Sequence, residues 1–323
     1  MEALHLTLTL QAAERILLLH EAAKRNGALV SISEIISLLP ESTSEHDLAA
    51  AFETSSPLSS RLELRSGYVM EKEDDRLRES AIANELERRG RALVAMGYAE
   101  RLTSLIQTSS TPLITVSGST SYKSASRFDD LDFFCVTQTR NLWVQLTRFL
   151  ILARAFGLTN RRSPQMCFSC AMDEDYAMKT FGTIQDPLFA RDVLQAVVLT
   201  GEGLYGRLLE TADWISDIYP SLYCTRRAQT KVGKMPSSRP RFGSVFLNRL
   251  LFIIVGSYVR AKASIRNRRL AKQLRNGEQF SILTGAGHLI YESRRYTQLR
   301  QSYIAANNRQ RTRSEMSTNE TQG

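Results

Sequence analysis

The chain has 323 residues, 43% of them apolar and 23% charged, and a formal net charge of +9. This balance excludes a wholly disordered chain, and four cysteines in such a length exclude a disulfide scaffold. The charge is unevenly spread, because residues 226–323 hold 20 Lys and Arg against 4 Asp and Glu. That excess of +16 leaves −7 for residues 1–225, so the sequence describes an acidic body with a basic C-terminal third.

The first 75 residues have the pattern of a small helical domain with a hairpin. Helical spacing and cap residues predict helices over 11–25, 33–39 and 44–52, and apolar–polar alternation over 61–71 predicts a β-hairpin. This order resembles a winged helix. The third helix has no Lys or Arg with which to meet DNA phosphates. A protein-docking or scaffold role is therefore favoured over DNA binding.

A long helix over 76–107 leads into the most informative part of the chain. A buried strand over 112–117 is followed by Gly118-Ser119, a ten-residue loop and a second strand over 131–137. The sequence then predicts a helix over 141–157, a strand over 166–172, and helices over 186–200 and 203–219.

Two aspartates stand at the start of the second strand. Asp130 and Asp132 are two residues apart, so in an extended chain they project to the same side. Two carboxylates so placed repel each other unless a cation lies between them, and Mg²⁺ prefers such oxygen ligands together with substrate phosphates. The pair predicts a metal site for phosphoryl or nucleotidyl transfer. A solvated pair of surface charges is the plain alternative.

The loop before the aspartates offers groups that suit a triphosphate. Gly118 lets the main chain come close to a phosphate, and Ser119 can bond it through its hydroxyl and N–H. Lys123 and Arg127 would add positive charge. We predict that these four residues bind a nucleotide.

The stretch from Val116 to Phe133 resembles the signature of the DNA polymerase β-type nucleotidyltransferase superfamily. That signature is a Gly-Ser or Gly-Gly pair, a loop of about nine to thirteen residues, and Asp-apolar-Asp. The continuation to about residue 175 is similar to uncharacterised prokaryotic nucleotidyltransferase-domain proteins. The resemblance implies a small mixed sheet, catalytic and metal-binding Asp130 and Asp132, Mg²⁺ as cofactor, and transfer of a nucleoside monophosphate from an NTP, with ATP expected.

The resemblance also implies a third carboxylate on a later strand. The strand over 166–172 contains no acid, and Asp173 at its end is the nearest candidate metal ligand. Some members of the superfamily are inactive. A catalytically degenerate protein that binds nucleic acid or a protein as a regulator is therefore the alternative function.

The basic C-terminal third is predicted to be helical. We expect a linker over 225–242, a helix over 246–274 with a very basic end, a last helix over 291–307, and a disordered tail after it. The cations have three interpretations: they bind a nucleic-acid acceptor, they hold the NTP or another phosphorylated substrate, or they form a solvated face near an anionic partner.

The two apolar stretches at 142–158 and 244–259 are interrupted by polar and charged residues. They predict buried amphipathic helices rather than membrane spans, so we expect a soluble cytoplasmic protein with no membrane. The expected fold class is α+β, with a winged-helix-like domain (1–75), a small mixed-sheet nucleotidyltransferase-like core (76–220), a basic helical region (221–305) and a disordered tail (306–323). The acceptor stays unidentified, with nucleic acid as one candidate.

Overall fold

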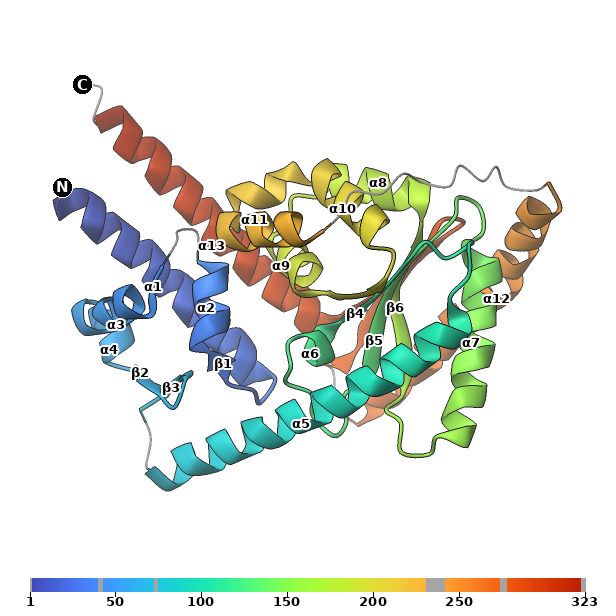
Figure 1. Ribbon diagram of the computed structural model, residues 1–323, viewed down its shortest axis with the longest axis horizontal. Coiled ribbons are helices and arrows are strands. Elements are labelled where there is room, and N and C mark those ends of the chain that lie inside the picture. Colours follow the sequence, from blue (N-terminus) through green and yellow to red (C-terminus); the bar gives the residue numbers. More distant parts are fainter. Residues whose placement is uncertain (1, 40–42, 73–74, 231–241, 274–277, 321–323) are drawn as a thin grey trace.

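The computed structural model describes residues 2–39, 43–72, 75–230, 242–273 and 278–320. It is a mixed α+β protein, mostly helical, with a six-stranded mixed sheet and a small three-stranded antiparallel sheet (Figure 1). The expected α+β class with a mixed sheet is confirmed at this level, whereas the C-terminal part, expected to be helical, contributes two strands to the large sheet.

The small sheet belongs to the N-terminal part. It has the order β1-β3-β2, and β2 and β3 form the predicted hairpin, with Ser66 and Gly67 at positive φ in the turn. The elements of this part are α1 (Glu2–Arg25), β1 (Val30–Ser31), α2 (Ile32–Leu38), α3 (Glu45–Thr54), α4 (Ser56–Ser59), β2 (Leu62–Arg65) and β3 (Tyr68–Glu71).

The large sheet has the strand order β7-β4-β5-β6-β9-β8. Only the β5–β6 pair is parallel, and every other neighbouring pair is antiparallel. The strands are β4 (Leu113–Ser117), β5 (Leu131–Thr137), β6 (Met166–Asp173), β7 (Val197–Thr200), β8 (Phe280–Gly285) and β9 (His288–Ser293).

Helices cover both faces of the large sheet. One face packs against α8, α9 and α10, and the other against α5, α7 and α12. The helices are α5 (Asp75–Ile106), α6 (Gly118–Ser121), α7 (Leu142–Thr159), α8 (Glu174–Thr183), α9 (Pro187–Gln195), α10 (Glu202–Thr211), the 3₁₀ helix η1 (Asp213–Asp217), α11 (Pro220–Gln229), α12 (Phe242–Lys272) and α13 (Arg294–Glu320). Alternate residues of β5 serve the two faces, since Phe133 and Cys135 join one core cluster while Phe134 and Val136 join the other.

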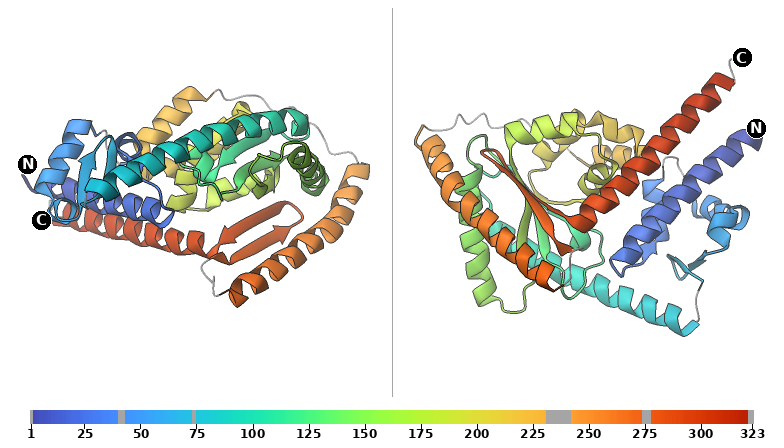
Figure 2. Two further views of the ribbon diagram at one scale, coloured as in Figure 1. Left: turned by 90° about the horizontal axis from the view of Figure 1, so that it is seen from below. Right: turned by 180° about the vertical axis from the view of Figure 1, so that it is seen from behind.

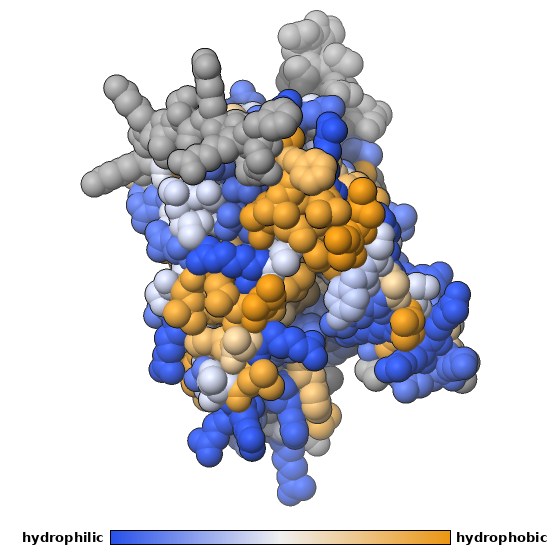
Figure 3. All heavy atoms as spheres, turned by 90° about the vertical axis from the view of Figure 1, so that its right-hand side faces the viewer, coloured by the Kyte–Doolittle hydropathy of each residue, from blue (hydrophilic) through white to orange (hydrophobic). Residues whose placement is uncertain are grey.

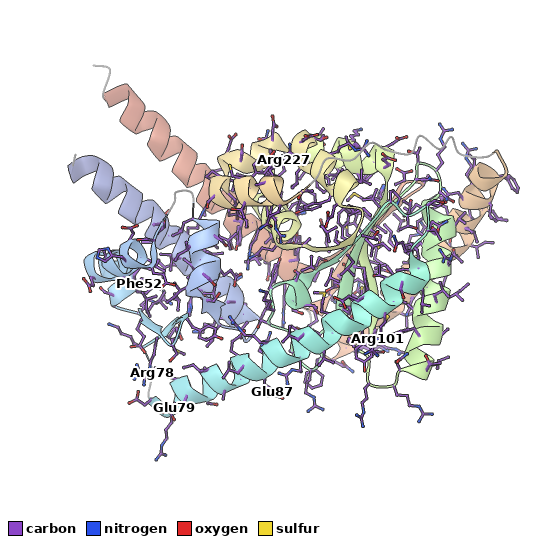
Figure 4. All side chains as sticks on the ribbon, in the orientation of Figure 1. Phe52, Arg78, Glu79, Glu87, Arg101 and Arg227 are labelled. Carbon is purple, nitrogen blue, oxygen red and sulfur yellow. The ribbon has the colours of Figure 1, made fainter. Side chains whose placement is uncertain are left out.

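Helix α5 connects the two parts of the protein. In Figure 4, Glu87 and Arg101 mark positions along this helix, which passes in front of the sheet after leaving the N-terminal part. Helices α1 and α13 lie side by side, and both chain ends are on the same side of the molecule (Figure 2). The first and last helices therefore pack together, and the N-terminal part is not an isolated domain.

Three expectations about the elements were wrong. Residues 197–200 form strand β7 rather than the end of a helix, and residues 280–293 form the β8–β9 hairpin, part of which was assigned to the last helix. The last helix, α13, continues to Glu320 where a disordered tail was expected. The expected linker was wrong in part as well, because its residues 225–229 belong to helix α11, while its residues 231–241 lie outside the described residues.

Helix α7 is the one helix of the described residues that is long and apolar enough to cross a membrane, by length and composition alone. Its Trp143, Leu146 and Phe149 are buried in the core, and α5 and α12 pack against it. The core-helix interpretation is therefore favoured.

Candidate active site

The two predicted aspartates lie at one end of the large sheet, where β4 ends and β5 begins. Ser117, the last residue of β4, pairs with Asp132 on β5. Gly118 then turns the chain with a φ of +66°. A Cβ at this position would lie 2.9 Å from Oδ2 of Asp132, so the main chain and the carboxylate are in close approach. Gly118 and Asp132 therefore meet, as the sequence predicted.

The two carboxylates influence each other electrostatically. Burial, together with the negative charge of Asp130, raises the pKa of Asp132 to about 7, although hydrogen bonds with the side chains of Cys167 and Ser169 oppose this rise. Burial also raises the pKa of Asp130, and the positive charge of Arg266 opposes it. A cation between the carboxylates would reverse this mutual repulsion, so their arrangement suits a divalent metal ion.

Arg266 is a site residue that local spacing did not single out. It lies on α12, 134 residues beyond Asp132, and its guanidinium is 5.2 Å from the centre of the Phe280 ring. Its charge acts on Asp130 and also on Cys167 and Tyr291. The basic helix therefore brings one of its cations to the Asp pair. The sequence showed only that this helix carries cations and no acid, and not which cation lies near the Asp pair.

Gln165 and the first residues of β6 complete the surroundings of the pair. Nε2 of Gln165 lies 3.5 Å from Oδ2 of Asp130. Cys167 stands opposite Asp132 in the parallel β5–β6 register. The strand beside the pair thus offers a thiol and a hydroxyl, from Cys167 and Ser169, where a carboxylate was expected.

Asp173 is not part of this site. It pairs with Thr137 at the far end of β5, five residues beyond Asp132, which corresponds to about 16 Å along a strand. Its side chain accepts hydrogen bonds from the main-chain N–H groups of Tyr176 (3.1 Å) and Arg140 (3.2 Å), and it caps the start of α8. The prediction of Asp173 as a metal ligand with Asp130 and Asp132 is therefore corrected, because Asp173 is a helix cap.

The remaining predicted residues lie in the loop after Ser119. Lys123, at a φ of +58°, and Arg127 are exposed, and Arg127 lies over the ring of Phe128 at 4.9 Å. Phe128 is 82% exposed, only two residues before Asp130. A cation and an aromatic face are therefore available at the edge of the Asp pair.

Helix α5 holds this loop by buried polar groups. Arg88 donates to the hydroxyl and carbonyl of Ser124 at 2.9 and 2.8 Å, and the Ser124 hydroxyl also bonds Glu85 at 3.0 Å. Glu85 in turn accepts from the main-chain N–H of Leu29 at 3.0 Å. Glu85 and Arg88 are both nearly inaccessible to solvent. The phosphate-loop candidate is thus fastened to the N-terminal part.

A second polar cluster anchors the other side of the loop. The Tyr122 hydroxyl donates to Asp192 on α9, and the neighbouring Arg191 lies over the Tyr122 ring at 4.8 Å. Arg191 also bonds Glu34 of α2 (2.9 Å) and the Tyr303 hydroxyl of α13 (3.0 Å). Burial raises the pKa of Asp192 to about 6. This cluster links the loop to three helices.

A separate groove of about 480 Å³ lies between α12 and β8. It is lined by residues that include Arg260, Asn267, Arg268 and Phe280, and the Asp pair is not among them. The side-chain amide of Asn267 bonds both the N–H (3.1 Å) and the carbonyl (2.7 Å) of Phe280. We place the candidate chemistry at the Asp pair rather than in this groove, because none of the described residues that line the groove is an acid.

Among the described residues, no group of three or more His, Cys, Asp or Glu side chains is arranged to hold a metal ion. All four cysteines are free. Comparisons with protein-family models, with curated proteins and with solved structures found no match for this chain.

Proposed function

We propose that the protein is a Mg²⁺-dependent nucleotidyltransferase that moves a nucleoside monophosphate from an NTP, with ATP expected, to an acceptor. The observation that carries this proposal is the approach of Gly118 to Asp132 at the end of the β4–β5 pair. A main chain that can approach phosphates then lies directly beside two carboxylates that can hold the metal.

In this proposal Asp130 and Asp132 hold Mg²⁺, which would offset the charge of the phosphates and polarise the phosphorus that is attacked. Gly118 and Ser119 bind the triphosphate through main-chain N–H groups and the Ser119 hydroxyl. Lys123, Arg127 and Arg266 supply positive charge around it. The Phe128 ring offers a stacking face for a base.

The test is incubation of the purified chain with each α-³²P-labelled NTP, Mg²⁺ and a cell extract, followed by fractionation for labelled acceptors. Asp132→Asn keeps the size of the side chain and should abolish labelling. Asp175→Asn, at an exposed acid beyond the far end of β6, is the matched control and should leave labelling unchanged. A wild-type protein that neither binds Mg-NTP nor labels any acceptor would contradict the proposal.

A second candidate function rests on the absence of an acid opposite Asp132 on the neighbouring strand β6. The neighbouring strand offers Cys167 and Ser169, and Asp173 caps a helix about 16 Å away. Strand β6 therefore supplies no carboxylate next to Asp132 that would take the proton from an attacking hydroxyl. In this alternative the nucleotidyltransferase-like core is a scaffold, and the winged-helix-like part and the basic third bind a protein or nucleic acid.

Two measurements separate the candidates. Mg-NTP binding with turnover supports the enzyme, whereas a salt-dependent shift of labelled nucleic acid without turnover supports the binding module. That shift should be lost when Arg266, Arg268, Arg269 and Lys272 are replaced by Gln, and it should not change in Asp132→Asn.

A further inference from the structure

Helix α12 exposes a long row of large apolar side chains. Phe246 is 70% exposed, Ile253 62%, Ile254 56% and Tyr258 57%, while Leu250 between them is 42% exposed. Their spacing of three and four residues places them on one side of the helix. The opposite side packs on the protein, where Phe252 contacts Trp143 and Val259 is buried in the core. These five exposed residues, which we call the α12 apolar row, are therefore not covered by the described chain.

Along helix α12 the charge is of one sign. Helix α12 has no Asp or Glu, and its seven cations include Arg249, Arg260 and Lys262, which are exposed. The segment before it, residues 231–241, adds four Lys and Arg and no acid to the sequence. The row thus has cations before it, beside it and after it along the chain.

Figure 3 faces the side of the molecule on which α7 and α12 lie, and hydrophobic residues are gathered there into patches with hydrophilic residues around them. Large contiguous apolar patches of this kind on a soluble protein mark a surface that meets another phase or partner. The partner has to accept aliphatic and aromatic side chains, and it has to be negatively charged.

Two other occupants fit less well. In a second copy of this chain, pairing along α12 would bring two acid-free, basic helices together, and their like charges would repel. A nucleic acid would meet the cations, but its phosphates offer nothing to Phe246, Ile253 and Ile254. An anionic lipid surface satisfies both features, because apolar side chains enter the headgroup–acyl boundary while Lys and Arg reach the headgroups.

We propose that α12 docks the protein on the surface of a membrane that contains anionic lipids, with the α12 apolar row turned toward the lipid. The helix lies on the membrane and does not cross it. The expectation of no membrane was drawn from the inability of this stretch to span a bilayer, which is a separate requirement from lying on its surface. The proposal is independent of the proposed nucleotidyl transfer, since docking needs no nucleotide.

The test is flotation of the purified full chain with vesicles, without nucleotide. One set is pure phosphatidylcholine, and the other has 30% phosphatidylglycerol in phosphatidylcholine. We expect partition onto the anionic vesicles, at least about tenfold weaker partition onto the neutral ones, and weakening by added salt. Ile253→Ser/Ile254→Ser should reduce partition onto anionic vesicles by roughly tenfold or more, because two large apolar groups no longer enter the lipid.

The matched control is Leu93→Ser/Val94→Ser, a neighbouring pair on α5 with exposed fractions of 73% and 62%. It should leave partition unchanged, and all replaced residues are exposed, so circular dichroism should match the wild type. The proposal would be overturned if the wild type did not partition onto the anionic vesicles. It would also be overturned if the α5 control lost as much partition as Ile253→Ser/Ile254→Ser. A dimer in analytical ultracentrifugation that Ile253→Ser/Ile254→Ser makes monomeric, without vesicle binding by the wild type, would assign the row to a second copy instead.

Discussion

At Gly118, the main chain and the Asp132 carboxylate leave no room for a side chain. An added Cβ would lie 2.9 Å from Oδ2 of Asp132, and the φ of +66° is unfavourable for any residue but glycine. We expect Gly118→Ala to displace the carboxylate and to lower Mg-NTP affinity at least tenfold, at a cost of about 1 kcal/mol in the free energy of unfolding. Calorimetric titration with Mg-NTP and urea unfolding measure the two effects.

Gly67→Ala is the control for this substitution. Gly67 also has a positive φ, +82°, but nothing lies within 4 Å of the added Cβ in its hairpin turn. It should therefore cost a similar free energy of unfolding and leave Mg-NTP affinity unchanged. If both variants lost affinity equally, Gly118 would be needed only for its backbone conformation.

At Asp192, burial predicts a dependence of stability on pH. Its pKa rises to about 6, with hydrogen bonds from Tyr122 and Tyr296 and the charge of Arg191 opposing the rise. Because the folded pKa lies above the unfolded one, the protonated form is favoured by folding. The stability contributed by this group is complete below about pH 4 and is lost as the pH rises through about 6.

Asp192→Asn cannot titrate, so it should flatten this part of the profile. The variant's free energy of unfolding, relative to the wild type, should be higher at pH 7 than at pH 4 by on the order of 1–2 kcal/mol. Urea unfolding at half-unit steps measures it. Parallel profiles for the two proteins would show that Asp192 is not the titrating group.

At the scale of elements, α5 and the loop from Ser119 to Asp129 form one polar assembly. Arg88→Met removes the two bonds to Ser124 and one of the two ion pairs of the buried Glu85, which keeps Arg89 at 3.7 Å. We expect a loss of about 2 kcal/mol in the free energy of unfolding, because the buried hydroxyl and carbonyl of Ser124 lose their donor, together with weaker Mg-NTP binding as the loop loosens. Urea unfolding and calorimetric titration of the variant measure the two changes.

The surface pair on the same helix gives the contrast. Glu87 is largely exposed in its ion pair with Arg91, so Glu87→Gln should change stability by less than about 1 kcal/mol and binding not at all. Equal effects of Arg88→Met and Glu87→Gln would mean that the buried contacts of Arg88 add no more to stability or to Mg-NTP binding than an exposed ion pair does.

The elements of the site core were predictable because their signals are local. Strands β4 and β5 are apolar runs, and the Gly-Ser pair follows the first of them directly. Asp130 and Asp132 are recognisable as a pair from their spacing at the start of the second. Strand β7 was missed because its Val-Val-Leu-Thr run continues the helical spacing of α9, although two adjacent valines favour a strand. The β8–β9 hairpin had a readable signal in Ala286-Gly287 between two alternating runs.

Long-range contributions could not be predicted. Arg266 reaches Asp130 only because α12 crosses the sheet edge near β8, and Cys167 meets Asp132 only through the parallel β5–β6 register. Spacing along the chain says nothing about either approach. The position of Asp173 could not be predicted either, because it depends on the register of β6, whose start and not its end lies beside Asp132.

For the whole molecule, the structure shows where the charges of the acidic body and of the basic C-terminal third lie relative to each other. The acidic body contains the Asp pair. Arg266 of the basic third lies close enough to this pair to act on Asp130, whereas other cations of α12 are exposed away from it. One helix therefore serves an inward and an outward surface. Substitution of outward cations should leave the site intact, and substitution of Arg266 should not.

The two halves of the chain also share one core. Ile16 and Leu38 lie in the same apolar cluster as Leu188 and Tyr219, and Arg15 donates to the carbonyl of Ile218 at 2.7 Å. The boundary expected at residue 75 therefore separates segments of sequence but not separate cores. We expect a single unfolding transition, because the apolar residues of the N-terminal part share one cluster with those of the rest of the chain.

Far-UV circular dichroism reports all helices, whereas fluorescence reports only Trp143 and Trp214, both outside the N-terminal part. The two unfolding curves should coincide in the wild type. Glu34→Gln removes the ion pair with the buried Arg191, so it should shift both curves together by about 2 kcal/mol, while Glu53→Gln on exposed α3 surface should shift neither. An earlier dichroism transition, with fluorescence unchanged, would show that the N-terminal part unfolds on its own.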